Sequence, residues 1–424
     1  MIQHIDVHQI IDAAPARVVV TRDTTGAVQE ASFDLSGLPR VDALLTGRPV
    51  VEVPGLVERL CSICPAAHHL AGMRALESLV GHSQMTPTAE AVRRLLHLGS
   101  VISIHVVGLI MTHPAEALVL RRFAKAAMAA AGSPGHFPVT GVPGGVAAPA
   151  DPAQRDLCAQ MVADALEAAR RVAAACMSAP VPEDHFTGAD VALVDDQGNL
   201  DLFGQLLRAV SADGTPLIPG ARAEQWDELV VEAVPGAPAP KPYLKALGAS
   251  SGAYRVGPVA QLRIGPVTTP VAQDLQTVWL AGAGGASSAR AIVMVHAVEA
   301  IAALLEAPEL VDGQTGHPWP ESLPEAVGVG WVDGARGLLV HRYATTDDGR
   351  VRVATILTPT AQNEPWLADL LRTAVEDSSG DTMRAGVEDA IREADPCLPC
   401  SSAPAGTMDL EVDTVSIDTS LKGL

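Results

Sequence analysis

The stretch that decides the fold is READPCLPCSSAPAG, residues 392–406, in which Cys397 and Cys400 follow an Asp-Pro step. A second Cys-x-x-Cys pair, Cys61 and Cys64, lies far upstream in VERLCSICPAAHHLAG. Four of the six cysteines in this chain of 424 residues therefore form two such pairs at opposite ends. Because thiolates at positions i and i+3 can both reach one metal ion, the two pairs together predict a four-sulfur metal site.

The composition indicates a globular protein whose core is built mainly from small aliphatic side chains. Hydrophobic residues make up 48% of the chain and charged residues 18%, whereas aromatic residues make up only 3%. The formal net charge of -20 argues against nucleic acid or anionic lipid as a partner, because both would repel the protein. Six cysteines in a chain of this length do not make a disulfide framework, and reduced thiols are typical of a cytoplasmic protein.

No targeting or membrane segment is expected. The first sixteen residues, MIQHIDVHQIIDAAPA, lack the basic and apolar regions of a signal peptide. The most apolar run, VISIHVVGLIM at residues 101–111, is too short to span a bilayer and is predicted to be a buried helix. We therefore expect a cytoplasmic protein with no direct membrane insertion.

Local patterns predict a mainly helical body with two small β-hairpins, an α+β fold. The hairpins are expected at residues 16–35 and 337–357, each around a turn signal that contains Asp and Gly. Apolar periodicity and helix-forming residues predict the long helices, which would surround the metal site. They are expected at residues 64–81, 86–111, 152–177, 286–306 and 381–394, the last ending at Asp395 because a proline follows it.

The chain is predicted to be one domain, residues 1–424, because no repeat or low-complexity linker interrupts it. Residues 180–242 are rich in Pro, Gly and acidic residues, so we expect a peripheral, loop-rich region there. A C-terminal tail is expected at residues 403–424. The two cysteine pairs flank the helical body, which places the metal site in its middle.

The cysteine pairs alone leave three interpretations open. They could hold structural zinc, they could be unrelated core cysteines, or they could form a redox metal centre. Local zinc ribbons separate their pairs by about 15–20 residues, unlike the spacing here. His68 lies one helical turn beyond Cys64, where an imidazole can donate to a thiolate, although a lone histidine can also be an ordinary core residue. The remaining cysteines, Cys158 and Cys176, are expected to be inert core residues.

At this point the sequence resembles a known family. The pattern Arg-x-Cys-x-x-Cys-x-x-x-His at residues 59–68, paired with Asp-Pro-Cys-x-x-Cys at residues 395–400, is similar to the large subunit of nickel–iron hydrogenases. Between the pairs, the segments VPGGV, YRVGPVAQL, ARGLLVH and TPTAQN resemble segments of that family in the family's order. MDLEV, residues 408–412, resembles the tail of its soluble, cytoplasmic branch.

The resemblance implies a nickel–iron centre and a role for each matching cysteine. Cys61 and Cys397 would be terminal ligands of nickel, and Cys64 and Cys400 would bridge nickel to iron. The iron would carry carbonyl and cyanide ligands. Hydrogen would be split heterolytically, with Cys397 as the first proton acceptor.

The resemblance also implies functions for residues around the metals. Arg336 would lie above them as a fixed positive charge, although a salt bridge within the hairpin is the ordinary alternative. Thr358 and Thr360 would hydrogen-bond a cyanide. Asp395 would support the ligands from behind, in addition to ending a helix. Asp42 would be a ligand of a structural magnesium ion.

Four positions depart from the family pattern. Ser62 replaces a glycine after the first cysteine, and Ala335 replaces the proline before the arginine. Ala13 aligns with a glutamate on the family's proton-exit route. Ala403 replaces a histidine that is both a magnesium ligand and the residue after which a maturation protease cuts. We therefore expect the magnesium site to be weakened or absent and the tail to remain uncut.

Two functional hypotheses follow. The first is the catalytic large subunit of a hydrogenase, and the second is a non-catalytic structural or regulatory subunit that keeps the fold. Either requires a partner, because the remaining cysteines cannot hold iron–sulfur clusters. We expect a small subunit with those clusters to cover an apolar face near residues 61–68, with diaphorase-type electron-transfer subunits as further candidate partners.

Overall fold

The computed structural model describes residues 16–35, 42–81, 84–181, 183–232, 241–376, 378–398, 401 and 403–417. Helices dominate this part of the chain, as the sequence predicts. They are α2 Asp42–Leu45, α3 Val53–Leu60, α4 Pro65–Leu79, α5 Pro87–Val107, α6 Pro114–Ala130, α7 Pro152–Ala159, α8 Val162–Met177, α9 Trp226–Leu229, α10 Pro258–Ile264, α11 Pro270–Val278, α12 Ala286–Leu305, α13 Pro359–Gln362, α14 Glu364–Glu376 and α15 Gly380–Ala394.

The strands form several small sheets rather than one large one. They are β1 Ala16–Arg22, β2 Val28–Phe33, β3 Gly141–Val142, β4 Gly145–Val146, β5 Ala189–Val194, β6 Leu206–Val210, β7 Pro216–Ala221, β8 Val230–Glu232, β9 Pro242–Leu244, β10 Tyr254–Arg255, β11 Val327–Gly334, β12 Gly337–Thr345, β13 Val351–Leu357 and β14 Leu410–Ser416. The larger sheets have the orders β14-β1-β2, β10-β5-β6-β7 and β11-β12-β13. The α+β fold class is confirmed.

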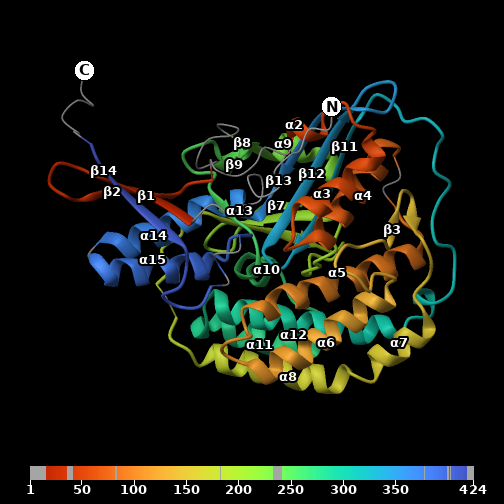
Figure 1. Ribbon diagram of the computed structural model, residues 1–424, viewed down its shortest axis with the longest axis horizontal. Helices are drawn as coiled ribbons and strands as arrows, with labels where there is room; N and C mark the ends of the chain where they lie inside the picture. Colours follow the sequence, from red (N-terminus) through yellow and green to blue (C-terminus); the bar gives the residue numbers. More distant parts are fainter. Residues whose placement is uncertain are drawn as a thin grey trace, which may run out of the picture.

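The long helices α5, α6, α8 and α12 pack against one another in one layer, with the strands and α3 and α4 on the other side of α5 (Figure 1). Several of these helices begin at a proline, whose fixed φ and missing N–H suit the first helical position. Thr86 caps α5 by accepting a hydrogen bond from the Ala89 N–H. Helix α12 is long and apolar enough to cross a membrane, but 67% of its apolar window is buried within the fold, as in a core helix.

Helix α4 carries His68 and lies directly on strand β11. The strand can come this close because glycine occupies two of its positions facing the helix. A Cβ atom at Gly330 would collide with the backbone of Ala75, and one at Gly328 would meet the carbonyl oxygen of the same residue. The GVGWVDG sequence therefore brings the β11–β12 hairpin against the helix that follows the first cysteine pair.

The ends of the described chain meet in one sheet. Strand β14 pairs in parallel with β1 over seven residues, from Ala16 opposite Leu410 to Arg22 opposite Ser416. The side chains of Met408 and Leu410 are buried, and Arg384 of α15 donates to both of their carbonyl oxygens. The tail predicted at residues 403–424 is thus folded against the body as far as residue 417.

Three expectations differ from the structure. Helix α5 ends at Val107 rather than at Met111, whose side chain is 73% exposed. The helix predicted at residues 152–177 is broken at Gln160 and Met161 into α7 and α8, both of which pack on α6. The expectation of a peripheral region does not hold for β5, because each of its residues is buried between neighbouring elements.

Candidate metal centre

Three of the four predicted ligand cysteines lie together. The sulfur atoms of Cys61 and Cys64 are 3.1 Å apart, and the sulfur of Cys64 is 3.5 Å from that of Cys397. All three are half-buried free thiols, so the site is less enclosed in this chain than the sequence predicts. Cys400 lies outside the described residues. The central expectation, that the two ends of the sequence converge on one sulfur cluster, is confirmed for these three residues.

Local backbone structure directs both segments toward the cluster. Helix α3 ends before Cys61, which is extended, and Cys64 directly precedes α4, where Pro65 takes the first position. The intervening turn lets the Cys64 N–H point at the Cys61 sulfur, 3.4 Å away. At the other end, Asp395 stops α15 in a left-handed conformation, with φ of 46°. Aspartate tolerates this conformation better than most residues, and the chain then turns into Cys397.

The thiols influence one another strongly. Hydrogen bonds from Cys397 and Cys64 lower the pKa of Cys61. Contacts with Cys397 and Cys61, together with burial, raise the pKa of Cys64 well above its usual value. The pKa of Cys397 is raised to about 12, chiefly by Cys61. Three sulfurs this close cannot all ionise without a positive counter-charge, and a soft metal cation would supply one.

Arg336 supplies a fixed positive charge beside the cluster. It occupies the two-residue turn of the β11–β12 hairpin, between the paired Gly334 and Gly337. Its Nη2 lies 3.2 Å from Oδ1 of Asp395, so its ion pair joins separate elements rather than lying within the hairpin. Burial lowers the pKa of Arg336, but the charges of Asp395 and Cys397 outweigh this effect and the net pKa is raised. The guanidinium therefore stays charged.

Asp395 stays ionised for the complementary reason. Burial raises the pKa of this carboxyl, but the positive charges of Arg336 and Arg290 outweigh it and the net pKa is lowered. These residues line a small cavity between α10, α12, α14 and α15, which Asn363 and Trp366 also border. Nε and Nη1 of Arg336 are buried with no hydrogen-bond partner among the described residues. The guanidinium thus keeps donors free for a further group.

His68 lies on α4 with one ring nitrogen close to the cysteines. Its ligand atom and the sulfurs of Cys61 and Cys64 all lie within 4.8 Å of one another. Nδ1 of His68 is 2.9 Å from Nε2 of His341, and Nδ1 of His341 is 2.6 Å from the hydroxyl of Tyr343. The sequence analysis did not predict His341 or Tyr343 as part of the site, since both are ordinary alternating residues of β12.

Thr358 and Thr360 lie where α13 begins. Thr358 caps that helix by accepting from the Ala361 N–H, and Thr360 Oγ1 accepts from the Cys397 N–H at 2.7 Å. Both hydroxyls therefore act as acceptors toward the backbone, which leaves the hydrogen of each available to donate to another group. Thr360 also connects α13 directly to the second cysteine pair.

A second histidine beside the first pair has a defined role that sequence reasoning missed. Nε2 of His69 accepts from the Gly141 N–H at 2.9 Å, so its hydrogen must lie on Nδ1, which is 2.8 Å from Glu58. Glu58 also lies 3.3 Å from Arg59, whose guanidinium is over the ring of Phe137. The adjacent HH dipeptide was the available signal, but the partners are too distant in sequence to be predicted from it.

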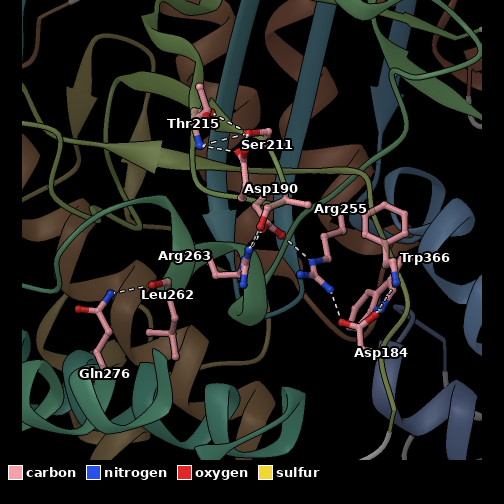
Figure 2. A network of polar contacts seen from close by, with 12 residues as sticks. Asp184, Asp190, Ser211, Thr215, Arg255, Leu262, Arg263, Gln276 and Trp366 are labelled. Atoms are coloured by element: carbon pink, nitrogen blue, oxygen red, sulfur yellow. Dashed lines mark hydrogen bonds and ion pairs between the residues drawn. The ribbon is translucent and has the colours of Figure 1, made fainter. Parts of the chain in front are cut away.

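An ion-pair network supports the far wall of the site (Figure 2). Arg255 pairs with Asp184 and Asp190, and Arg263 also donates to Asp190, whose side chain is fully buried. Trp366 donates from Nε1 to Asp184 at 3.3 Å and borders the cavity beside Arg336. The network ties β5 and β10 to α10 and α14, which surround that cavity.

The remaining predicted positions are at the margins of what the structure describes. Asp42 is the first residue of α2, but its side chain lies outside the described part, as does Ala13. Ala403 offers only its backbone carbonyl, which accepts a hydrogen bond from Arg392. Cys158 is fully buried away from the cluster, and burial raises its pKa to about 12, as expected of a core thiol.

Comparison with known proteins agrees with this geometry. A family model described as "Nickel-dependent hydrogenase" matches residues 40–109. A subunit of the vhu F420-non-reducing hydrogenase of Methanococcus voltae is 30% identical over 407 residues, covering 85% of this chain and 95% of the relative. The beta subunit of the NAD-reducing hydrogenase of Cupriavidus necator is 28% identical, covering 93% of each chain.

Solved structures show the same fold. The chain superimposes on a crystal structure of NAD+-reducing [NiFe]-hydrogenase in the H2-reduced state with a TM-score of 0.79 and 28% identity, covering 90% of this chain and 95% of that one. The Ni-Fe-Se hydrogenase of D. vulgaris Hildenborough gives a TM-score of 0.65 at 17% identity, which is a likeness of fold alone.

Proposed function

Because the chain belongs to the nickel-dependent hydrogenase family, we propose that the cluster of Cys61, Cys64 and Cys397, completed by Cys400, holds a nickel–iron centre. The chain is a hydrogenase large subunit, an oxidoreductase that acts on H2. The observation that carries the proposed site is the convergence of three thiols from both ends of the sequence beside a buried, charged arginine.

The residues of the chain fit such a centre. Soft thiolates suit nickel and iron, and the raised pKa values of Cys64 and Cys397 indicate that the cluster needs a compensating cation. The bound centre would supply the chemistry of polarising H2 and splitting it heterolytically. We propose carbonyl and cyanide ligands on its iron, with the free hydroxyl hydrogens of Thr358 and Thr360 as donors to a cyanide.

The protein's own part in the reaction is positioning and proton handling. Arg336, held by Asp395, places a permanent positive charge with unused N–H donors beside the cluster. Such a preorganised charge stabilises developing negative charge without reorientation during the reaction. Cys397 is the proposed first proton acceptor, at Sγ, and its backbone N–H is fixed by Thr360.

A partner carrying iron–sulfur clusters is proposed to cover the open side of the cluster. Ser62 is exposed, and next to the first cysteine pair Arg59 stacks over Phe137, which is 39% exposed, close in sequence to Val139, which is 64% exposed. Apolar side chains beside a half-buried redox site suit a protein interface. Relatives named as subunits of NAD-reducing and F420-non-reducing hydrogenases support a multisubunit cytoplasmic enzyme, with diaphorase-type subunits as further partners.

Loss of the family's histidine at Ala403 leads to two further proposals. The magnesium site, to which Asp42 would contribute, is weakened or absent, because alanine offers no side-chain ligand. The tail after Ala403 is retained, since β14 is paired with β1 and its first residue is buried. Metal analysis and the mass of the intact protein test these proposals separately.

The experiment that tests the proposed function is metal analysis of the natively purified protein combined with infrared spectroscopy. Equal amounts of nickel and iron, with bands of metal-bound carbonyl and cyanide and with H2-dependent reduction of a dye, are expected. Nickel and iron without activity would favour a non-catalytic subunit. Zinc in the cluster, or no metal and no bands, would rule out the nickel–iron centre.

A further inference from the structure

The buried chain of His68, His341 and Tyr343 has a direction that the hydrogen-bond partners determine. All three side chains are almost fully buried, with exposures of 5%, 0% and 0%. The three residues meet through His68 Nδ1 and His341 Nε2 at 2.9 Å and through His341 Nδ1 and the Tyr343 hydroxyl at 2.6 Å. Each contact joins one donor to one acceptor, so fixing one hydrogen fixes all of them.

The hydroxyl of Tyr343 decides which way the chain runs. Among the described residues, the structure gives it His341 Nδ1 as its hydrogen-bond partner. If His341 donated to the tyrosine oxygen, the hydroxyl hydrogen would be left buried without an acceptor, which is costly. If the tyrosine donates instead, every group in the chain is satisfied. Deep burial, which lowers the pKa of His341 well below its usual value, also keeps that ring neutral.

The consequence passes to the cysteines. With Tyr343 as donor, the hydrogen of His341 lies on Nε2 and is donated to Nδ1 of His68. A neutral His68 must then carry its hydrogen on Nε2, the ring nitrogen left for the sulfurs of Cys61 and Cys64. A hydrogen bond to a thiolate withdraws electron density that the sulfur would otherwise give to a metal.

We propose that Tyr343 and His341 are positioning residues, which act through His68 by fixing it as an N–H donor to the cysteine cluster. The inference rests on the proposed function, because the cluster's electronic properties matter only if it holds the metal centre. Strand β12, which carries His341 and Tyr343, begins directly after Arg336 in the hairpin turn. One hairpin would therefore supply both the fixed charge and the support for the thiolate donor.

The chain offers a matched control. Tyr254 is also fully buried, and its hydroxyl donates to Gln362 at 3.2 Å rather than to a histidine. Tyr254→Phe removes a buried hydroxyl of the same kind, but none of the described hydrogen bonds links that hydroxyl to the cysteines. Tyr343→Phe removes the donor at the start of the proposed chain and preserves the packing of the ring.

The test is nitrogen NMR of the full-length protein with ring-labelled histidine, in which His68→Gln and His341→Gln assign the signals. In the wild type, Nδ1 should be unprotonated and Nε2 protonated in both rings. Tyr343→Phe should abolish this preference in His341, whereas Tyr254→Phe should leave both rings unchanged. A hydrogen on Nδ1 of His341 in the wild type would overturn the proposal, even if Tyr343→Phe failed to fold.

A second readout addresses the metal centre. In the loaded enzyme, Tyr343→Phe should shift the infrared bands of the iron-bound ligands and lower kcat about two- to tenfold at unchanged nickel content, as the loss of one supporting hydrogen bond implies. Bands identical to those of Tyr254→Phe would contradict the proposed coupling. Absence of nickel would instead contradict the proposed function, while the NMR result on the histidines would stand independently.

Discussion

The ion pair between Arg336 and Asp395, with Nη2 and Oδ1 3.2 Å apart, joins the tip of a β-hairpin to the residue that ends the last helix. Asp395 is two residues from Cys397, so the pair fixes the second cysteine segment and the guanidinium relative to each other. Neither side chain can be replaced by one of the same charge without change, because a lysine has no planar fork and a longer carboxylate would move the contact.

Arg336→Lys tests the need for that geometry. The variant keeps the positive charge but loses the fixed donors, so H2 oxidation should fall about 100-fold or more at unchanged nickel content. Arg342→Lys is the matched control on the same hairpin, because Arg342 pairs with Asp227 near the surface and is remote from the cysteines in its contacts. Activity of Arg336→Lys close to that of the control would show that charge alone suffices.

Cys64→Ser tests the ligand set. Hydroxyl oxygen is a poor ligand for nickel and low-valent iron, so nickel and iron per chain should fall about tenfold or more. Cys158→Ala removes a buried thiol that lies outside the cluster and should leave both metals in place. Metal analysis of the two purified variants decides the question, and equal metal contents would contradict the assignment of Cys64.

Leu410→Ala tests whether the tail is part of the folded protein. Leu410 is 6% exposed at the start of β14, so its truncation should lower the stability by about 2–5 kcal/mol. Glu411→Ala, at the next and exposed position, should change it by about 0.5 kcal/mol or less. Thermal unfolding measures both. A purified wild-type protein with a mass below 43.9 kDa by the length of the tail would show instead that the tail is removed.

Glu364→Gln should alter how stability depends on pH. Both carboxylate oxygens of Glu364 are buried without a hydrogen-bond partner in the described structure, and burial raises its pKa from 4.5 to about 7. The folded protein therefore holds this proton more tightly than the unfolded chain, and the resulting stability is present below pH 4.5 and is lost as the pH rises through about 7.

The glutamine variant has no such proton to lose. Its unfolding temperature should exceed that of the wild type by an amount that grows from about pH 4.5 and levels off above about pH 7. Glu376→Gln, at the exposed end of the same helix, should follow the wild-type pH profile. Parallel profiles for the wild type and Glu364→Gln would mean that the buried carboxyl does not titrate in this range.

Much of the fold could be predicted because its signals are local. Pro65 and Pro87 mark the first positions of α4 and α5, and the Asp-Gly turns at residues 23–26 and 347–349 mark two hairpins. The cysteine pairs were recognisable because a metal site requires a fixed spacing of its ligands. These features depend on a few neighbouring residues, so one sequence is enough to reveal them.

Other features depend on tertiary contacts and could not be predicted in this way. Nothing in the residue types at Gln160 and Met161 breaks a helix, yet the chain turns there to keep α7 and α8 on α6. The link between His68 and His341 spans 273 positions, and His69 meets Glu58 only because α3 and α4 fold together. Without the fold, these residues look like ordinary members of a helix or a strand.

The pairing of β1 with β14 has a consequence for the order of events during synthesis. The first strand leaves the ribosome early, and its parallel neighbour is among the last segments to be made. The sulfurs of Cys64 and Cys397 are likewise separated by 333 positions. A growing chain therefore holds half a metal site and an unpaired sheet edge until translation ends. Metal loading must follow release of the finished chain, and until then chaperones would have to shield that edge from aggregation.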